Sequence, residues 1–197
     1  LIGAPTDSTT GRAYLHNAST GALVHVLQPT STTGITSFGA SVKTGPDASG
    51  DGIPDLLIGA PDADTNGSTD NGAIYCFDTV TGAEIYRTDG PPSGIVAGAG
   101  PGLGTTSCTI HDVNGNGTDD VLYGVPWADP LVLGTPVIDA GIAQIRDGAT
   151  GALIMTLKDL VPQPSDFYGM AVRAYNDVDG DSIPDFIIGV AGADIHT

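Results

Sequence analysis

Short apolar runs separated by turn-forming residues recur along the chain. Residues 56–60 and 73–77 are apolar runs, and residues 62–71 between them are polar and rich in Asp and Asn. Residues 38–44 carry an apolar side chain at every second position, which is the pattern of a strand with one buried face. Residues 83–87 form a fourth run after a Thr-Gly turn. This stretch therefore predicts four short strands joined by turns.

The same pattern returns at a fixed spacing of 65 residues. An aromatic or leucine residue followed by Gly opens each copy, at residues 38–39, 103–104 and 168–169. An apolar run around a Gly follows, at residues 57–61, 122–126 and 187–191. A period of this length with four strands in each copy predicts the blades of a β-propeller. A β-solenoid would have shorter and more uniform copies, and a β-sandwich would not need the period.

The period divides the chain into blades of one all-β fold, a partial β-propeller with four antiparallel strands in each blade. We predict complete blades at residues 38–102 and 103–167, the last three strands of a preceding blade at 1–37, and the first two of a following blade at 168–197. These are about three blade equivalents, and a propeller ring takes about four to eight blades. We therefore expect further blades from the same longer chain or from another copy. The absence of an initiator Met and of a signal peptide favours a longer or processed polypeptide.

An acidic loop of nine residues lies between the first two expected strands of each blade. Its copies read DASGDGIPD at residues 47–55, DVNGNGTDD at 112–120 and DVDGDSIPD at 177–185. Oxygen-bearing side chains occupy positions 1, 3, 5 and 9, and position 4 is always Gly. Calcium takes about six to eight oxygen ligands from a chain that can curl around it. The loops therefore predict a structural calcium ion in each of the three copies.

The expected calcium ligands are the four side chains just described and the backbone carbonyl at position 7. They are Asp47, Ser49, Asp51, Asp55 and the carbonyl of Ile53 in the first loop; Asp112, Asn114, Asn116, Asp120 and the carbonyl of Thr118 in the second; and Asp177, Asp179, Asp181, Asp185 and the carbonyl of Ile183 in the third. An EF-hand would have a bidentate Glu at position 12, where this chain has Ile58, Tyr123 and Ile188. Solvated turns are the alternative interpretation, which the shared register of three copies disfavours.

The loops differ in the number of carboxylates that they offer. The third loop has four, the first has three and the second has two, which predicts that calcium affinity falls in that order. Magnesium is disfavoured because it requires a rigid octahedron and retains its water ligands.

The chain carries a formal net charge of −17, with only six Lys and Arg residues. Such an acidic chain repels nucleic acid, so we expect no nucleic-acid partner. Three calcium ions would add six positive charges and change −17 to −11. No apolar stretch is long enough to span a bilayer, so we expect no membrane insertion by this segment.

No residue pattern indicates an active site, and we expect no enzymatic activity. Ser, His and Asp do not occur together in a recognisable catalytic context, and the four His residues share no spacing typical of metal ligands. The predicted cation loops account for nearly all of the acidic clusters. Cys76 falls on an expected core position and Cys108 on the polar side of its strand, so we expect no disulfide between them.

These motifs resemble FG-GAP repeats, the blades of the integrin alpha-subunit β-propeller and of its prokaryotic relatives. Residues 38–39 and 59–61 match the Phe-Gly and Gly-Ala-Pro of that family fully, and the other two copies match them loosely. The resemblance implies calcium in the loop between the first two strands of each blade. It also implies an extracellular or cell-surface module for adhesion, protein recognition or surface assembly. Such repeats occur as well in lectin-like proteins and in accessory domains of enzymes, so a carbohydrate-binding propeller and an accessory domain of a secreted lyase or hydrolase stay open.

The loops between the second and third strands differ in length and predict a binding surface. They span residues 6–10, 62–71 and 127–140. In a propeller these loops lie on the face opposite the acidic loops, and insertions on one face of a repeat array often mark its binding face. The longest contains Trp127, Leu131 and Leu133, which we predict to contact a protein or glycan partner. Packing of Trp127 beneath its own loop is the alternative.

Overall fold

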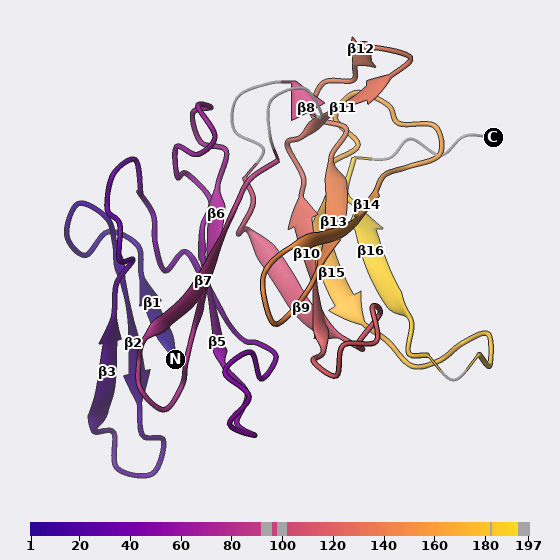
Figure 1. The fold of residues 1–197 in the computed structure, drawn as a ribbon. Coiled ribbons are helices and arrows are strands. Elements are labelled where there is room, and N and C mark those ends of the chain that lie inside the picture. The colour runs from indigo at the N-terminus through magenta and orange to yellow at the C-terminus, as the bar shows by residue number, and fades with distance from the viewer. Residues whose placement is uncertain (92–95, 98–101, 182, 193–197) are drawn as a thin grey trace.

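The computed structural model describes residues 1–91, 96–97, 102–181 and 183–192. All regular elements within these ranges are strands, and they form antiparallel sheets of two to four strands (Figure 1). In that part of the chain no helix is long and apolar enough to cross a membrane. The sheets follow one another in chain order, which confirms the all-β propeller-blade fold predicted from the repeat.

Two sheets have four strands each, in the order of a meander. The first complete blade contains β4 (Ser41–Thr44), β5 (Leu56–Ala60), β6 (Ala73–Phe77) and β7 (Glu84–Asp89). The second complete blade contains β9 (Thr106–Ile110), β10 (Asp120–Val125), β13 (Ile142–Arg146) and β14 (Leu153–Leu157). Every neighbouring pair within a blade is antiparallel, as short connections require.

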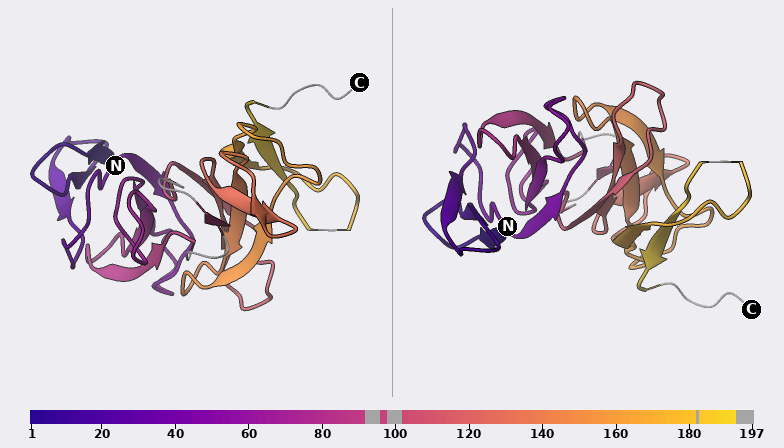
Figure 2. Two further views of the ribbon diagram at one scale, coloured as in Figure 1. Left: turned by 90° about the horizontal axis from the view of Figure 1, so that it is seen from above. Right: turned by 90° about the horizontal axis from the view of Figure 1, so that it is seen from below.

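Two smaller sheets flank the complete blades. The N-terminal sheet contains β1 (Ile2–Ala4), β2 (Arg12–His16) and β3 (Leu23–Leu27), and the C-terminal sheet contains β15 (Tyr168–Ala174) and β16 (Phe186–Val190). Seen along the sheet edges, the four sheets lie side by side from one terminus to the other (Figure 2). Within the described residues, the N-terminal sheet thus has three strands and the C-terminal sheet two.

The first strand of the first complete blade is shorter than the pattern predicted. The expected strand at residues 38–44 begins only at Ser41, because Phe38 forms an isolated parallel bridge to Gly11 of the preceding sheet. Gly39 then turns the chain with a φ of 95° before β4 starts. Phe38 therefore belongs to the boundary between two sheets and not to a strand, whereas Tyr168 of the third copy bridges to Gly141 and also begins β15.

The segment at residues 127–140, which was predicted to be a loop, contains a small hairpin. Its strands are β11 (Asp129–Val132) and β12 (Thr135–Pro136), and β11 also pairs with β8 (Val96–Ala97). The sequence did not predict this hairpin for two reasons. Pro130 disfavours a strand at β11, and the pairing of β11 with the distant β8 leaves no local pattern in the sequence. Figure 1 shows the hairpin at the edge of the sheets opposite the acidic loops.

The hydrophobic core is divided into clusters that lie between consecutive blades. Every residue of β5 and of β6 is buried. Alternate residues face different neighbours: Ile58 and Tyr75 pack toward the preceding sheet, whereas Leu57 and Ile74 pack toward the second complete blade. Inner strands covered on both faces explain the continuous apolar runs of the sequence.

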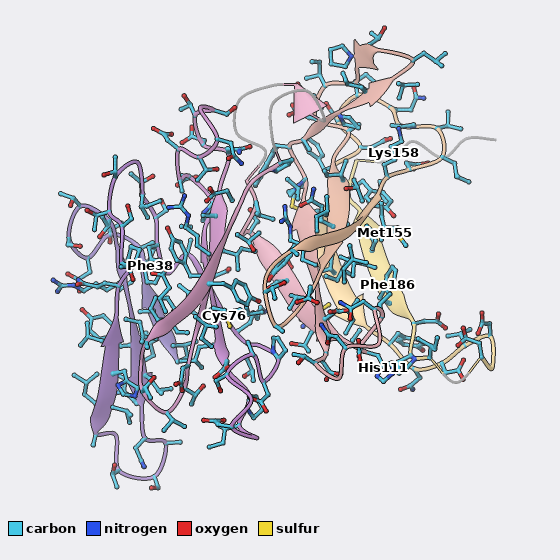
Figure 3. All side chains as sticks on the ribbon, viewed as in Figure 1. Phe38, Cys76, His111, Met155, Lys158 and Phe186 are labelled. Atoms are coloured by element: carbon cyan, nitrogen blue, oxygen red, sulfur yellow. The ribbon has the colours of Figure 1, made fainter. Side chains whose placement is uncertain are left out.

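The aromatic residue that opens the first complete blade lies at the centre of one such cluster. The ring of Phe38 meets Tyr75 at a centroid distance of 5.2 Å and Phe77 at 5.9 Å, both edge to face. Cys76, one residue along β6, faces the opposite cluster and is fully buried (Figure 3). Burial raises the pKa of its thiol to about 12, and both Cys76 and Cys108 are free, as expected.

The glycines that mark the repeat contact one another across the blade boundaries. A Cβ atom added to Gly59 would lie 2.1 Å from the carbonyl oxygen of Gly104 in the next blade, and the corresponding distance from Gly124 to Gly169 is 1.8 Å. The Gly104 carbonyl also accepts a hydrogen bond of 2.6 Å from Ser41 Oγ. Neighbouring blades therefore touch through backbone, at points where no side chain fits.

We expect Gly124→Ala to lower the free energy of unfolding by about 2 kcal/mol or more, because the new methyl group overlaps the Gly169 carbonyl and one blade must shift. Gly189→Ala is the matched control, since its added Cβ would come no closer than 3.4 Å to a described neighbouring atom. Urea unfolding gives the free energy of unfolding of both variants and of the parent chain. Equal losses of stability would contradict the role assigned to the inter-blade contact.

Candidate cation-binding loops

The three acidic loops lie at one edge of the successive sheets. They connect β4 to β5, β9 to β10 and β15 to β16, and Figure 1 shows all three at the lower end of the molecule. The turns between the third and fourth strands reach the same edge. The repeat therefore places equivalent loops side by side, each beside a turn of its own blade.

Each loop is wrapped around the carboxylate at its first position. Asp47 Oδ1 accepts hydrogen bonds from the backbone N–H groups of Gly50 and Asp51, at 2.8 and 3.1 Å, and its Oδ2 accepts from Gly52 at 2.8 Å. Asp112 repeats this pattern with the equivalent residues of the second loop, and Asp177 accepts from Gly180 at 2.7 Å. These backbone bonds, led by that from Gly117, hold the pKa of Asp112 below its ordinary value.

The carboxylate at position 9 joins the loop to the sheet and to the neighbouring turn. Asp55 and Asp120 are fully buried. Asp120 Oδ2 accepts from the N–H of Val113 at 2.8 Å, and its Oδ1 accepts from Gly148 at 3.1 Å in the turn between β13 and β14. Asp55 is held in the same way by Ser49 and Thr79. Each carboxylate oxygen has a second lone pair, so these bonds leave room for a cation.

The side chain at position 5 holds the residue whose carbonyl is an expected ligand. Asp51 Oδ1 accepts from the N–H of Ile53 at 2.8 Å, Asn116 Oδ1 from Thr118 at 2.8 Å, and Asp181 Oδ1 from Ile183 at 2.7 Å. The same local turn thus forms in all three loops. It leaves the second oxygen of Asp51 and of Asp181 as a possible cation ligand, which Asn116 lacks.

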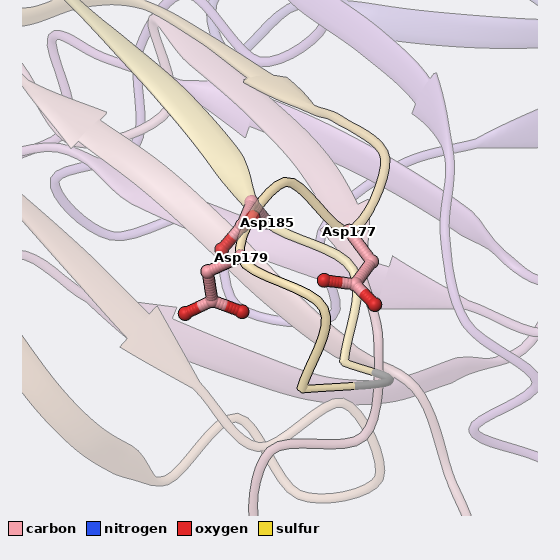
Figure 4. A group of neighbouring side chains, drawn as sticks. All are labelled: Asp177, Asp179 and Asp185. Atoms are coloured by element: carbon pink, nitrogen blue, oxygen red, sulfur yellow. The ribbon is translucent and has the colours of Figure 1, made fainter.

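The third loop brings three of its expected ligands together. Oxygen atoms of Asp177, Asp179 and Asp185 lie within 4.8 Å of one another (Figure 4). Ligands on opposite sides of a calcium ion lie about 5 Å apart, so this spacing fits the ion, and the donor set contains only oxygen. Asp181 stays outside the group. Among the described residues, neither of the other two loops gathers three carboxylates in this way.

The residues predicted to contact a partner do not form one exposed surface. Trp127 is half-buried, and its ring packs so closely on Gly102 that a Cβ there would lie 2.5 Å from it. Leu131 is half-buried in β11, whereas Leu133 is fully exposed at the tip of the hairpin. Leu133 is therefore the member of this set that is free to meet a partner.

One contact of the second loop was not predicted from the sequence. Asp147, in the turn between β13 and β14, accepts hydrogen bonds at Oδ2 from Asn114 Nδ2 at 2.6 Å and from Asn116 Nδ2 at 2.5 Å. The only signal in the sequence was the recurrence of Asn or Asp at this turn position in each blade, at Asn17, Asp78 and Asp147.

Comparison with known proteins agrees with these features. The FG-GAP repeat family matches residues 38–77. Integrin alpha-PS2 of Drosophila melanogaster is 34% identical over 166 residues, which cover 80% of this chain and 12% of that protein. Integrin alpha-2 of Mus musculus is 28% identical over 204 residues, which cover 98% of this chain and 16% of that protein. The chain thus spans less than one fifth of the length of these relatives.

We expect Asp120→Ala to destabilise the chain even in the presence of a chelator, because it leaves two backbone N–H groups without their acceptor. Each buried donor left unpaired costs about 1–3 kcal/mol, so the expected loss is about 2 kcal/mol or more. Asp119→Ala is the matched control, since that side chain is exposed and its contact with His111 is 3.9 Å long. Denaturant unfolding of both variants gives the comparison. A loss as large in the control would refute the anchoring role of Asp120.

Proposed function

Because the chain is an FG-GAP repeat protein with an integrin-like β-propeller fold, we propose that it is a calcium-stabilised recognition module of an extracellular or cell-surface protein. The observation that carries this proposal is the convergence of Asp177, Asp179 and Asp185 in a loop that recurs, in register, on the same edge of two further blades. Oxygen-only donor sets of this kind suit calcium and not the softer transition metals.

Calcium would be held in each loop by the side chains at positions 1, 3, 5 and 9 and by the carbonyl at position 7. When bound, the ion supplies positive charge at a point where carboxylates otherwise repel one another. The chain's own residues prepare this point: backbone N–H groups orient the first Asp, and the buried position-9 Asp fixes the end of the loop to the second strand. Since the folded loop binds the ion and the unfolded chain does not, binding stabilises the fold.

The blades proposed at residues 38–102 and 103–167, with partial blades on either side, would form part of a longer propeller. Further blades would come from the same longer chain or from another copy. Millimolar calcium outside cells would load even weak sites, which suits an extracellular position. The module itself would be non-enzymatic and would act in adhesion or protein recognition.

The partner would bind on the face opposite the acidic loops. The hairpin of β11 and β12 projects there and exposes Leu133, with Ile138 also half exposed nearby in the chain. Exposed apolar residues at the tip of an insertion are typical of a protein contact. A glycan partner is less well served, because the one Trp of the chain is half-buried.

The calcium proposal is tested by ion content and thermal unfolding. We expect about three calcium ions to bind to the chain, and chelation to lower the melting temperature by several degrees or more. Added calcium should restore the melting temperature, and magnesium at the same concentration should not. A chain that binds no calcium and melts at the same temperature with and without chelator would refute the proposal.

The recognition proposal is tested with surfaces coated with the chain. We expect cells to attach to the coated surface, and Leu133→Asp to reduce that attachment by at least about half, because a charge replaces an apolar contact. Leu23→Asp, an exposed leucine on the outer strand β3, is the matched control. A glycan array probed in parallel separates a carbohydrate partner from a protein one. Unchanged attachment of the Leu133 variant would remove the hairpin from the binding surface.

A further inference from the structure

We propose that Asp147 is a ligand of the cation in the second loop, although it lies outside that loop. The inference rests on the proposed binding of calcium and names an additional member of one site. Asp147 belongs to the turn between β13 and β14, and the loop lies between β9 and β10 of the same blade. The side chain is partly buried against the loop.

The position of the carboxylate carries the argument first. Asp147 Oδ2 lies 2.6 Å from Asn114 Nδ2 and 2.5 Å from Asn116 Nδ2. Asn114 and Asn116 occupy positions 3 and 5, where the expected ligands of a bound ion stand. One carboxylate oxygen of a distant turn therefore touches two expected ligand side chains at once.

The orientation of the two amides shows what a cation would change. The nitrogen and the oxygen of an Asn side chain exchange places by a half-turn about its last bond, whose rotation is broad. In the structure the amide nitrogens donate to Asp147. With the amide oxygens turned inward, three oxygens would crowd together and repel one another unless a cation lay between them. The carboxylate of Asp147 can therefore have either of two kinds of partner, the two amide donors or a hard cation.

The charge of the second loop determines what this additional ligand would change. The second loop contains two carboxylates, Asp112 and Asp120, against three in the first loop and four in the third. As a ligand, Asp147 would raise the number of carboxylates of the second site to three, the number that the first loop offers. Since calcium affinity follows ligand charge, the second site should then bind about as tightly as the first, and not more weakly as the loop composition alone predicts.

The equivalent turns show that this use of the residue is specific to the second blade. Asp78, at the same turn position in the first complete blade, uses both oxygens within its own turn: Oδ1 accepts from Val80 and Thr81, and Oδ2 accepts from Thr81 Oγ1. Asp147 holds its turn through Oδ1 alone, which accepts from Thr150 at 2.8 Å. Its Oδ2 is directed to the loop.

Asp147→Asn tests the proposal with little disturbance, because the amide oxygen can still accept from Thr150 while the charge facing the loop is lost. Calcium titration of the full chain is followed by NMR at the loop glycines: Gly50 and Gly52 report on the first loop, Gly115 and Gly117 on the second, and Gly180 on the third. We expect the dissociation constant of the second loop to rise by at least about tenfold, and those of the other loops to stay unchanged. Asp78→Asn is the matched control and should alter no site.

A purely structural role is separated by rescue. Asn116→Asp gives the second loop the carboxylate that the other loops carry at position 5, so it should restore calcium affinity in the Asp147→Asn background. If the single variant does not fold, Asn116→Asp is compared with Asn116→Asp/Asp147→Asn, and equal affinities of these two would overturn the proposal.

The outcomes distinguish this inference from the proposed function. Calcium-dependent shifts at the glycines of all loops, with a second-loop affinity that Asp147→Asn leaves within about twofold, would overturn the ligand role and leave calcium binding intact. A wild-type chain whose loop glycines do not respond to calcium would overturn both. Loss of affinity at the second loop alone, restored by Asn116→Asp, supports the assignment.

Discussion

The close approach of backbone between consecutive blades is the constraint on which the rest of the structure depends. Gly59 meets Gly104, and Gly124 meets Gly169, at distances that exclude even a methyl group. This approach sets the spacing between sheets, so that the inner strands are covered on both faces and the core lies between blades. The two glycine motifs of the repeat are thus the two halves of one contact, formed between successive copies and not within one.

A fixed spacing between sheets has a consequence for the charged edge. The acidic loops lie at the same edge of neighbouring blades. Residues of the first and second loops, Asp47 and Thr118 among them, line a common hollow. Carboxylates that would repel one another are therefore held close by the packing of the apolar core. The free energy that holds them close comes from burial of β5, β6, β10 and β13. The register of these strands is fixed, because a shift by one residue would move their buried side chains to the wrong face.

The inner strands could be predicted from the sequence, and the boundaries between blades could not. β5 and β6 span the predicted residues because apolar runs closed by turn formers leave little choice of strand ends. The predicted strand that opens the first complete blade begins three residues before β4. The alternating pattern includes Phe38, and its bridge to Gly11 of the preceding sheet leaves no signal in the sequence. For the same reason the reach of Asp147 was missed: spacing in sequence places a turn beside a loop, but only the folded blade shows which oxygen of a side chain faces it.

The two kinds of contact divide the work of holding the molecule together. Glycine contacts act between blades, whereas every expected cation ligand, Asp147 included, comes from the blade that carries the loop. The carboxylates at position 9 connect the loop to the second strand and, through hydrogen bonds, to the turn between the third and fourth strands of the same blade. A cation bound as proposed would therefore stiffen one edge of a single blade, and its ligands would include no residue of the neighbouring blade. Removal of such an ion should loosen the loop edge of each blade first, while the glycine contacts keep the blades stacked and the opposite face in place.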